Sequence, residues 1–213
     1  MSEANGHTLT RRGERRREAI VEAATRLFLQ HGYGDTTVEM VIAEAGGSRK
    51  TVYDYFGGKD GLFRTVVDAV VADTQAELQA LEFEDRPPHD ALTRFARGFL
   101  GTLLEPRHTA LQRTIVAESH RFPQLGELFF QCAVDPAYAR LEAYFRRMQE
   151  QGRLVFQDPG LSAGQFLQAL GGDANMRALF AQPTPTDREE IDRRIAVLVD
   201  LFLHGCQPSG RPR

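Results

Sequence analysis

The sequence has no tryptophan, only two cysteines and no long run of apolar residues. Cys132 and Cys206 lie far apart, so they predict neither a disulfide framework nor a CxxC metal site, and they fit a reducing compartment. No apolar run approaches the roughly 18 residues that a membrane-spanning helix needs, and the polar N-terminus does not resemble a signal peptide. We therefore expect a cytoplasmic chain with no membrane partner.

The sequence also lacks the motifs of the common enzyme classes. It contains no nucleophile elbow, no HExxH pair and no phosphate-binding glycine loop. His108 and His120 are the closest pair that suggests a metal site, but no third ligand accompanies them, and we expect both at the surface. The sequence thus predicts no enzymatic activity, no cofactor and no bound metal.

Charge is spread unevenly along the chain. The formal net charge is −3, yet residues 1–65 hold 10 Lys and Arg against 9 Asp and Glu, which leaves a net charge of +1 there and −4 in the rest. Five arginines lie between Arg11 and Arg17, with Glu14 as the only acid among them. A basic segment before a helix can bind phosphates or can be a solvated tail, and by itself it favours neither.

Apolar residues recur at helical spacing along most of the chain. Ile20, Ala23, Ala24, Leu27 and Phe28, for example, form a single stripe, whereas no convincing alternating strand pattern is present. Glycines and prolines separate the helical segments. The expected helices are 14–30, 38–45, 49–55, 59–81, 89–105, 109–121, 124–151, 161–180 and 187–204. The predicted fold class is therefore all-α with about nine helices, and Asp135-Pro136 either kinks or restarts the seventh.

Three of these helices are short and lie within about 45 residues of each other, which is typical of a helix-turn-helix unit. Thr36 and Glu39 have the spacing of a capping box for the second helix, and Ser48 is a suitable N-cap for the third. The third helix begins with Arg49 and Lys50, where the helix dipole is positive, so it can enter a major groove and donate to guanine. These groups also have an ordinary interpretation as a solvated surface.

Residues 15–63 resemble the DNA-binding domain of the tetracycline-repressor (TetR/AcrR) family. The most specific part is the string S-x-x-T-[LV]-Y-x-[YH]-F-x-x-K-x-x-L-F, which begins at Ser48 and ends at Phe63. Residues of about 110–204 resemble the AefR-like branch, through segments such as Ile115-Val116-Ala117-Glu118 and Leu201-Phe202-Leu203-His204-Gly205. The resemblance implies a homodimeric, ligand-responsive regulator, usually a repressor, that is nucleoid-associated in a bacterial cytoplasm.

The resemblance also implies which residues contact DNA. Together with Arg15 and Arg16 of the basic arm, the candidate DNA-binding residues are Thr37, Ser48, Arg49, Lys50, Thr51, Tyr53, Tyr55 and Lys59. Two positions depart from the family pattern. Gly47 replaces the usual apolar residue of the turn, and Glu39 lies where some members have a base-reading arginine. We expect Glu39 to cap its helix.

We expect residues 1–60 to form the arm and helix-turn-helix domain, 61–205 the ligand-binding and dimerisation domain, and 206–213 a flexible tail. The segment 195–203 is apolar on nearly all sides, which predicts burial on more than one face. The candidate dimer residues are Leu167, Leu170, Met176, Leu179, Phe180, Ile195, Leu198, Val199 and Phe202. Burial inside one monomer is the alternative. A two-fold dimer would bind near-palindromic double-stranded DNA.

The family places its effector site among the helices between the DNA-binding domain and the dimer helices. The candidate ligand-binding residues are Phe95, Phe99, Leu103, Ile115, Phe129, Phe130, Tyr138, Phe145, Met148 and Gln168, with Tyr144, Gln165 and Asn175 as further possibilities. Such aromatic positions are also typical of a plain core. Two alternatives stay open: a regulator or activator that needs no ligand, and a redox sensor that uses Cys132 or Cys206.

Overall fold

The protein is all-helical. The computed structural model describes residues 11–80, 82–83, 85–184 and 187–206, with the side chains of 73–75, 77–78 and 206 left out. These residues form ten α-helices and one π-helical segment, and no strand occurs among them. The predicted fold class is confirmed. None of the described helices is both long and apolar enough to cross a membrane.

The first four helices follow the predicted order. They are α1 (Arg11–Asp35), α2 (Val38–Ala45), α3 (Arg49–Phe56) and α4 (Lys59–Ala80). The arginines of the predicted arm are therefore already helical, because α1 begins at Arg11. Gly32 breaks the helical conformation near the end of α1, with φ of 83° and ψ of 171°. Since glycine has no Cβ, it adopts such angles at little cost.

The remaining helices mostly begin at prolines. They are α5 (Pro88–Leu103), α6 (Pro106–Glu118), α7 (Pro123–Phe129), the π-helical segment η1 (Phe130–Val134), α8 (Asp135–Glu150), α9 (Pro159–Leu179) and α10 (Arg188–Cys206). Proline is favoured in the first turn because its missing N–H has no partner there anyway.

The single long helix that the sequence suggested over 124–151 is in fact α7, η1 and α8. Phe130, Val134 and Asp135 all have helical backbone angles, so the chain passes from α7 through η1 into α8 without leaving the helical conformation.

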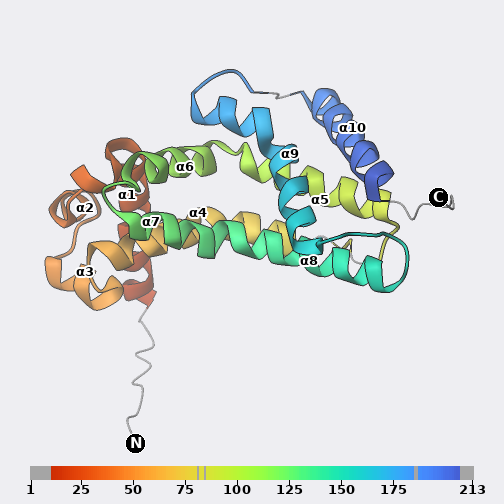
Figure 1. Cartoon of the computed structure of the whole chain (residues 1–213). Helices are drawn as coiled ribbons and strands as arrows, with labels where there is room; N and C mark the ends of the chain where they lie inside the picture. The colour runs from red at the N-terminus through yellow and green to blue at the C-terminus, as the bar shows by residue number, and fades with distance from the viewer. Residues whose placement is uncertain (1–10, 81, 84, 185–186, 207–213) are drawn as a thin grey trace, which may run out of the picture.

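Two buried clusters support the two ends of the molecule (Figure 1). One contains α1, α2, α3 and the first part of α4, together with residues of α6 and α7. The other contains residues of α5, α8, α9 and α10. Helices α4, α6 and the α7–α8 rod run between the two ends. The predicted apolar side of α4, from Leu62 to Val70, lies in the first cluster, so the start of α4 belongs with the helix-turn-helix.

Helix α9 is bent in a way that the sequence analysis did not predict. Gly172 has non-helical angles, with φ of 8° and ψ of −109°, and divides α9 into two helical parts (Figure 1). The second part, residues 173–179, lies over a cavity that is described below.

Candidate DNA-binding surface and cavity

Two hydroxyl groups cap the helices of the helix-turn-helix. Ser48 caps α3 by accepting a hydrogen bond from the backbone N–H of Thr51 at 3.2 Å, which confirms the predicted cap. Helix α2 is capped by Thr37, which accepts from the N–H of Met40 at 3.2 Å, and not by Thr36. The capping box expected for Thr36 and Glu39 is therefore wrong by one residue.

Thr36 instead anchors the start of α2 to the end of α1. Its side chain is completely buried, and its hydroxyl lies 2.8 Å from the carbonyl oxygen of Gly32 and 3.2 Å from that of Leu27. A buried hydroxyl must keep such partners, because leaving it without them costs roughly 1–3 kcal/mol.

The turn between α2 and α3 depends on close approach by an arginine. Gly46 and Gly47 have positive φ angles of 75° and 113°. The guanidinium of Arg16 donates to the carbonyl of Ala45 at 3.4 Å. A Cβ on Gly46 would lie only 2.7 Å from a nitrogen of this guanidinium. Arg16, a candidate DNA contact, thus ties α1 to this turn in the free protein, whereas Arg15 is exposed.

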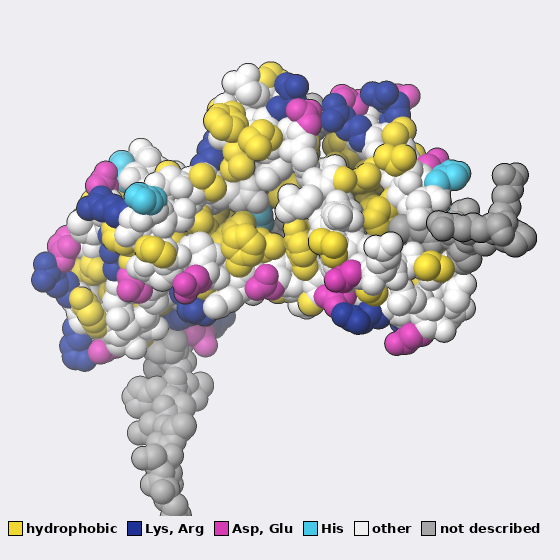
Figure 2. Space-filling model, viewed as in Figure 1, with side chains coloured by type: hydrophobic (Ala, Val, Ile, Leu, Met, Phe, Trp, Pro, Cys, Tyr) yellow, Lys and Arg dark blue, Asp and Glu magenta, His cyan; other side chains and the backbone are white. Residues whose placement is uncertain are grey.

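Helix α3 presents its first charged residues to solvent. The side chains of Arg49 and Lys50 are 72% and 82% exposed. Arg49 forms an ion pair with Glu39, and Lys50 forms one with Asp54 at 2.7 Å. Exposed ion pairs contribute only about 0–1 kcal/mol, so phosphate or base oxygens can replace their acidic partners. Figure 2 shows Lys and Arg side chains among acidic ones at this end of the molecule.

Glu39 does not act as the expected capping-box partner. The pKa of Glu39 is lowered, mainly because its carboxylate accepts a hydrogen bond from its own backbone N–H in the first turn of α2. Arg49 and the Thr37 hydroxyl lower this pKa further. Glu39 therefore stays ionised and holds Arg49 on the α2 side of α3.

The other candidate DNA contacts differ in exposure. Tyr53 is 60% exposed. Thr51 is half-buried and shares a hydrogen bond with the Ser48 hydroxyl at 3.0 Å. Tyr55 is half-buried against the core, with its ring edge-to-face to Phe56. Tyr53 is therefore the most accessible aromatic side chain of α3.

Lys59 is engaged inside the protein. Its ammonium donates to the carbonyl of Gly34 at 3.1 Å and lies 4.4 Å from the centre of the Tyr33 ring. Burial lowers the pKa of Lys59, against the opposing effect of Glu118 and Asp60. Lys59 therefore helps to hold the end of α1 against the start of α4.

The same region joins the helix-turn-helix to α6. The Gly34 N–H donates to a carboxylate oxygen of Glu118, the last residue of α6, at 3.0 Å. The Tyr33 hydroxyl contacts the carboxylate of Asp60. The pKa of Tyr33 is raised, mainly by burial and to a smaller extent by Asp60. We name Tyr33, Gly34, Lys59, Asp60 and Glu118 the junction.

A cavity of about 720 Å³ lies among α5, α6, α7, η1, α8 and α9. Figure 2 shows hydrophobic side chains around the hollow in the middle of the molecule. The volume falls within the roughly 300–1,000 Å³ of small-molecule sites. Its lining residues are Phe99, Thr102, Leu103, His108, Gln112, Ile115, Val116, Ser119, Gly126, Phe129, Phe130, Ala133, Val134, Tyr138, Leu167, Gln168, Gly171, Gly172, Asp173, Asn175, Met176 and Leu179.

The structure brings most of the candidate ligand residues to this wall. Those that line it are Phe99, Leu103, Ile115, Phe129, Phe130, Tyr138 and Gln168, and Asn175 lines it as well. Phe95, Phe145 and Met148 do not reach it, because they pack in the core of the second cluster. Tyr144 also lies in that core, and Gln165 is exposed on α9.

Sequence reasoning missed three buried polar residues of the wall. Thr102, His108 and Gln112 are 9%, 5% and 9% exposed. The prediction that His108 lies at the surface is wrong, because the side of α6 that carries His108 faces the cavity. Burial lowers the pKa of His108, opposed by Glu105. The spacing of His108 and Gln112 by one helical turn, on the side of α6 that holds Leu111 and Ile115, was a signal that could have identified them.

Helices α9 and α10 carry exposed apolar side chains. Met176, Phe180, Val197 and Leu201 are 56%, 70%, 63% and 72% exposed. We name these four residues the α9–α10 face. Several candidate dimer residues instead face the protein's own core, namely Leu167, Leu170, Ile195 and Val199, and Phe202 packs against Phe145 and Phe166. Leu179 and Leu198 are half-buried.

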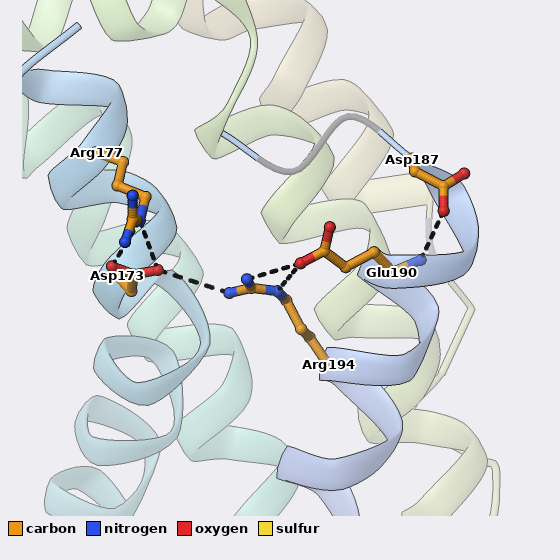
Figure 3. Close-up of polar contacts among 5 residues, drawn as sticks. All are labelled: Asp173, Arg177, Asp187, Glu190 and Arg194. Atoms are coloured by element: carbon orange, nitrogen blue, oxygen red, sulfur yellow. Dashed lines mark hydrogen bonds and ion pairs between the residues drawn. The ribbon is translucent and has the colours of Figure 1, made fainter. Parts of the chain in front are cut away.

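Ion pairs fix the second part of α9 to its neighbours (Figure 3). Asp173 pairs with Arg177 at 2.9 Å and with Arg194 of α10 at 3.8 Å, and Arg194 also pairs with Glu190 at 2.8 Å. On the other side, Arg113 of α6 donates to the last carbonyls of α9, including that of Leu179 at 3.1 Å. The second part of α9 is thus connected to both α10 and α6.

Within the part of the chain that the structure describes, no group of three or more His, Cys, Asp or Glu side chains is placed to bind a metal ion. Cys132 is half-buried. The pKa of its thiol is raised to about 11, mainly by burial and to a smaller extent by a hydrogen bond with Asp68. The side chain of Cys206 lies outside the described residues, as does the predicted tail after it.

The chain is similar to known regulators. It is 29% identical to YhgD of Bacillus subtilis strain 168, an uncharacterized HTH-type transcriptional regulator, over 88% of this chain and 94% of YhgD. It is 34% identical to the HTH-type transcriptional repressor ComR of Escherichia coli strain K12 over 37% of this chain. That match spans only 38% of ComR, and a similar match spans 31% of the regulator HbdR of Aromatoleum sp. strain CIB.

Solved structures are similar over nearly the whole chain. The flavonoid-responsive regulator FrrA has a TM-score of 0.78 and 29% identity, over 92% of this chain and 100% of FrrA. A protein named as a putative TetR-family transcriptional regulator from Mesorhizobium loti MAFF303099 has a TM-score of 0.80 and 25% identity, over 93% of this chain and 100% of the other.

Two family descriptions match the two ends of the chain. Residues 20–66 match the bacterial regulatory proteins of the tetR family, and residues 90–205 match the C-terminal domain of AefR-like transcriptional repressors. Since the second match alone covers more than half of the chain, the protein belongs to the tetR family and has an AefR-like C-terminal domain.

Proposed function

We propose that this protein is a transcriptional regulator that binds near-palindromic double-stranded DNA as a homodimer and leaves it when a small molecule fills the cavity. The observation that carries the DNA-binding part is the capped helix α3, whose first two residues are Arg49 and Lys50, both exposed and paired only with replaceable carboxylates. A helix N-terminus with this chemistry suits the major groove.

The α9–α10 face supports the homodimer. An exposed apolar patch on a chain of this size is typical of an interface. Helix α10 and the first part of α9 lie away from α3, and the second part of α9 lies over the middle of the molecule, so a two-fold axis beside these helices leaves both copies of α3 accessible (Figure 1). Two such helices one DNA turn apart, about 34–36 Å, require a near-palindromic site.

Selection of duplexes from a random-sequence pool by the purified protein tests DNA binding. We expect enrichment of a near-palindromic site whose half-site centres lie one or two helical turns apart. Recovery of unrelated sequences, bound no better than competitor DNA, would contradict the proposal.

Leu201→Arg tests the dimer, because it places a charge on the most exposed residue of the α9–α10 face. Light scattering should show a monomer, with loss of high-affinity binding to the selected duplex. Val155→Arg is the matched control, since Val155 is similarly exposed, at 57%, but lies before α9 and outside this face. A dimer in Leu201→Arg would contradict the assignment of this face.

The small-molecule part rests on the cavity and on α6. This helix lines the cavity with His108, Gln112 and Ile115, and its last residue, Glu118, holds the Gly34 N–H of the junction. A ligand that favours a shifted position of α6 must therefore also shift the end of α1, and with it α3. FrrA, which is named as flavonoid-responsive, supports a small-molecule effector for this chain.

Reciprocity gives a test that needs no identified effector. If DNA and cavity ligand are coupled, the selected duplex must weaken cavity binding by the same factor by which the ligand weakens DNA binding. We expect the duplex to weaken binding of the uncharged dye Nile red about 5–150-fold. Glu118→Ala should bring that factor close to one while the dimer stays intact.

Glu127→Ala, an exposed glutamate on the neighbouring α7, is the control and should keep the full factor. Equal coupling in Glu118→Ala and the parent protein would show that the junction does not transmit the signal. Absence of any coupling in the parent protein would favour a regulator that needs no ligand.

A further inference from the structure

The cavity wall is poor in charge. Among the residues that the structure describes, no lysine and no arginine line it. Asp173 is the only carboxylate of the wall within the described part of the chain. It is exposed and already pairs with Arg177 and Arg194 (Figure 3). A charged group that leaves water for such a site finds no counter-charge to offset its lost hydration. The cavity is therefore unsuited to a carboxylate, a phosphate or an ammonium group.

Four polar atoms of the wall are buried without a hydrogen-bond partner among the described residues. They are Thr102 Oγ1, His108 Nδ1, Gln112 Oε1 and Asn175 Oδ1. They come from three helices, α5, α6 and α9, and all four residues line the cavity. Buried polar atoms are nearly always hydrogen-bonded in native proteins, so four such atoms around one cavity require an explanation.

Their chemistry specifies the complementary group. The amide oxygens of Gln112 and Asn175 only accept hydrogen bonds, and the Thr102 hydroxyl can accept as well. Because burial lowers the pKa of His108, the imidazole is neutral at pH 7 and offers one further accepting nitrogen or one donor. Most of these atoms are satisfied by a molecule that donates.

The rest of the wall specifies the skeleton. Phe99, Phe129, Phe130 and Tyr138 contribute aromatic rings, and Leu103, Ile115 and Leu167 contribute aliphatic surface. Aromatic rings pack favourably against other rings, in offset or edge-to-face arrangements. A flat, mainly apolar molecule is the best match for such a wall.

We propose that the cavity binds an uncharged, hydroxylated aromatic molecule whose hydroxyl groups donate to Gln112, Asn175 and Thr102. The proposal rests on the proposed function, which makes this cavity the effector site, and adds the chemical class of the effector.

Isothermal titration of the full-length protein with three probes of one skeleton tests the class. The probes are a trihydroxystilbene, its trimethyl ether and a stilbene dicarboxylate. The ether keeps the shape without the donors, and the dicarboxylate adds charge. We expect the trihydroxystilbene to bind at least about tenfold more tightly than either, because one good hydrogen bond in a buried site contributes about that factor.

Two variants test the assigned residues. Gln112→Leu and Asn175→Leu should each weaken trihydroxystilbene binding about tenfold and leave trimethyl ether binding within about threefold. Gln165→Leu is the matched control, because Gln165 is an exposed amide on α9 that does not line the cavity, and it should bind the probe like the parent protein.

Equal or tighter binding of the ether or the dicarboxylate would overturn the proposal, and so would the absence of binding by all three probes. Unchanged trihydroxystilbene affinity in both Gln112→Leu and Asn175→Leu would overturn the residue assignment. The proposed function is judged separately, by duplex selection and by the coupling between duplex and Nile red, so either conclusion can fail while the other stands.

Discussion

The DNA-binding surface and the cavity wall treat their polar side chains in opposite ways. On α3, Arg49 and Lys50 are charged, more than 70% exposed, and paired with acidic neighbours. In the cavity, Thr102, His108 and Gln112 are uncharged, at most 9% exposed, and each has a buried side-chain atom without a partner among the described residues. The difference matches the two proposed ligands: a highly charged polymer at the surface, and a neutral molecule in the cavity.

The energetic reason is the solvent. An exposed ion pair is cheap to break, since water replaces either partner, so a surface can keep its charges satisfied until DNA arrives. An unpartnered polar atom in a buried wall lowers stability by roughly 1–3 kcal/mol until a ligand satisfies it. The unpartnered groups of the cavity wall therefore lower the stability of the ligand-free protein, whereas the paired charges of the DNA-binding surface do not.

The double substitution Arg49→Ala and Lys50→Ala should produce the largest effect on DNA binding, because it removes both exposed positive charges at the start of α3. We expect affinity for the selected duplex to fall at least about 100-fold, since each base or phosphate contact contributes about 1–3 kcal/mol. Fluorescence anisotropy measures this, and the slope of log K against log salt should become shallower.

Arg107→Ala, an exposed arginine at the start of α6, is the control for that variant and should bind the duplex normally. Affinity close to that of the parent protein in the double variant, with the dimer intact, would exclude α3 as the recognition helix.

A matched pair of buried threonines sharpens the comparison further. Thr36 has two carbonyl partners and Thr102 has none among the described residues. We expect Thr36→Val to lower the free energy of unfolding by about 1–3 kcal/mol, and Thr102→Val to leave it unchanged or raise it by up to about 1 kcal/mol.

Urea denaturation at one fixed protein concentration measures both variants, because the stability of a dimer depends on concentration. Similar destabilisation by the two substitutions would show that the Thr102 hydroxyl has a partner that it lacks among the described residues.

A smaller effect should come from the titration of His108. Burial lowers its pKa from the ordinary 6.5, with Glu105 opposing the shift. Below pH 6.5 the unfolded chain therefore binds a proton more readily than the folded protein, and stability is lost as the pH falls. The loss between about pH 7 and pH 5 should be smaller in His108→Gln, measured by urea denaturation across that range.

His120→Gln, an exposed histidine just beyond α6, is the control for that series and should follow the parent protein. An identical pH profile in His108→Gln and the parent protein would contradict the neutral, buried state of His108.

The smallest effect on DNA binding should come from Cys132. Its thiol has a pKa of about 11, raised from 9.0 mainly by burial. Reaction with iodoacetamide near pH 7.5 should be about 100-fold slower than for an ordinary thiol, because the thiolate is the reacting form. Treatment with peroxide should leave duplex affinity unchanged, whereas loss of affinity that Cys132→Ser prevents would restore the redox-sensor alternative.

Local sequence patterns predicted the helices well. The Ser48 cap, the glycines of the α2–α3 turn and the apolar side of α4 all followed from residue types at helical spacing. The Thr36 cap was misplaced by one residue, because adjacent threonines are equivalent by sequence and only burial distinguishes them. Arg16 and Lys59 are basic and near the predicted surface, yet each has a partner from another segment.

The sequence by itself determined the helical class, the helix-turn-helix and the charged start of α3, because propensity, capping and periodicity act over a few residues. Only the tertiary structure decided that His108, Gln112 and Thr102 face one cavity, that Gly172 bends α9 over it, and that Glu118 connects α6 to Gly34. These features depend on which faces of distant helices meet, and that choice is made by packing of the whole chain.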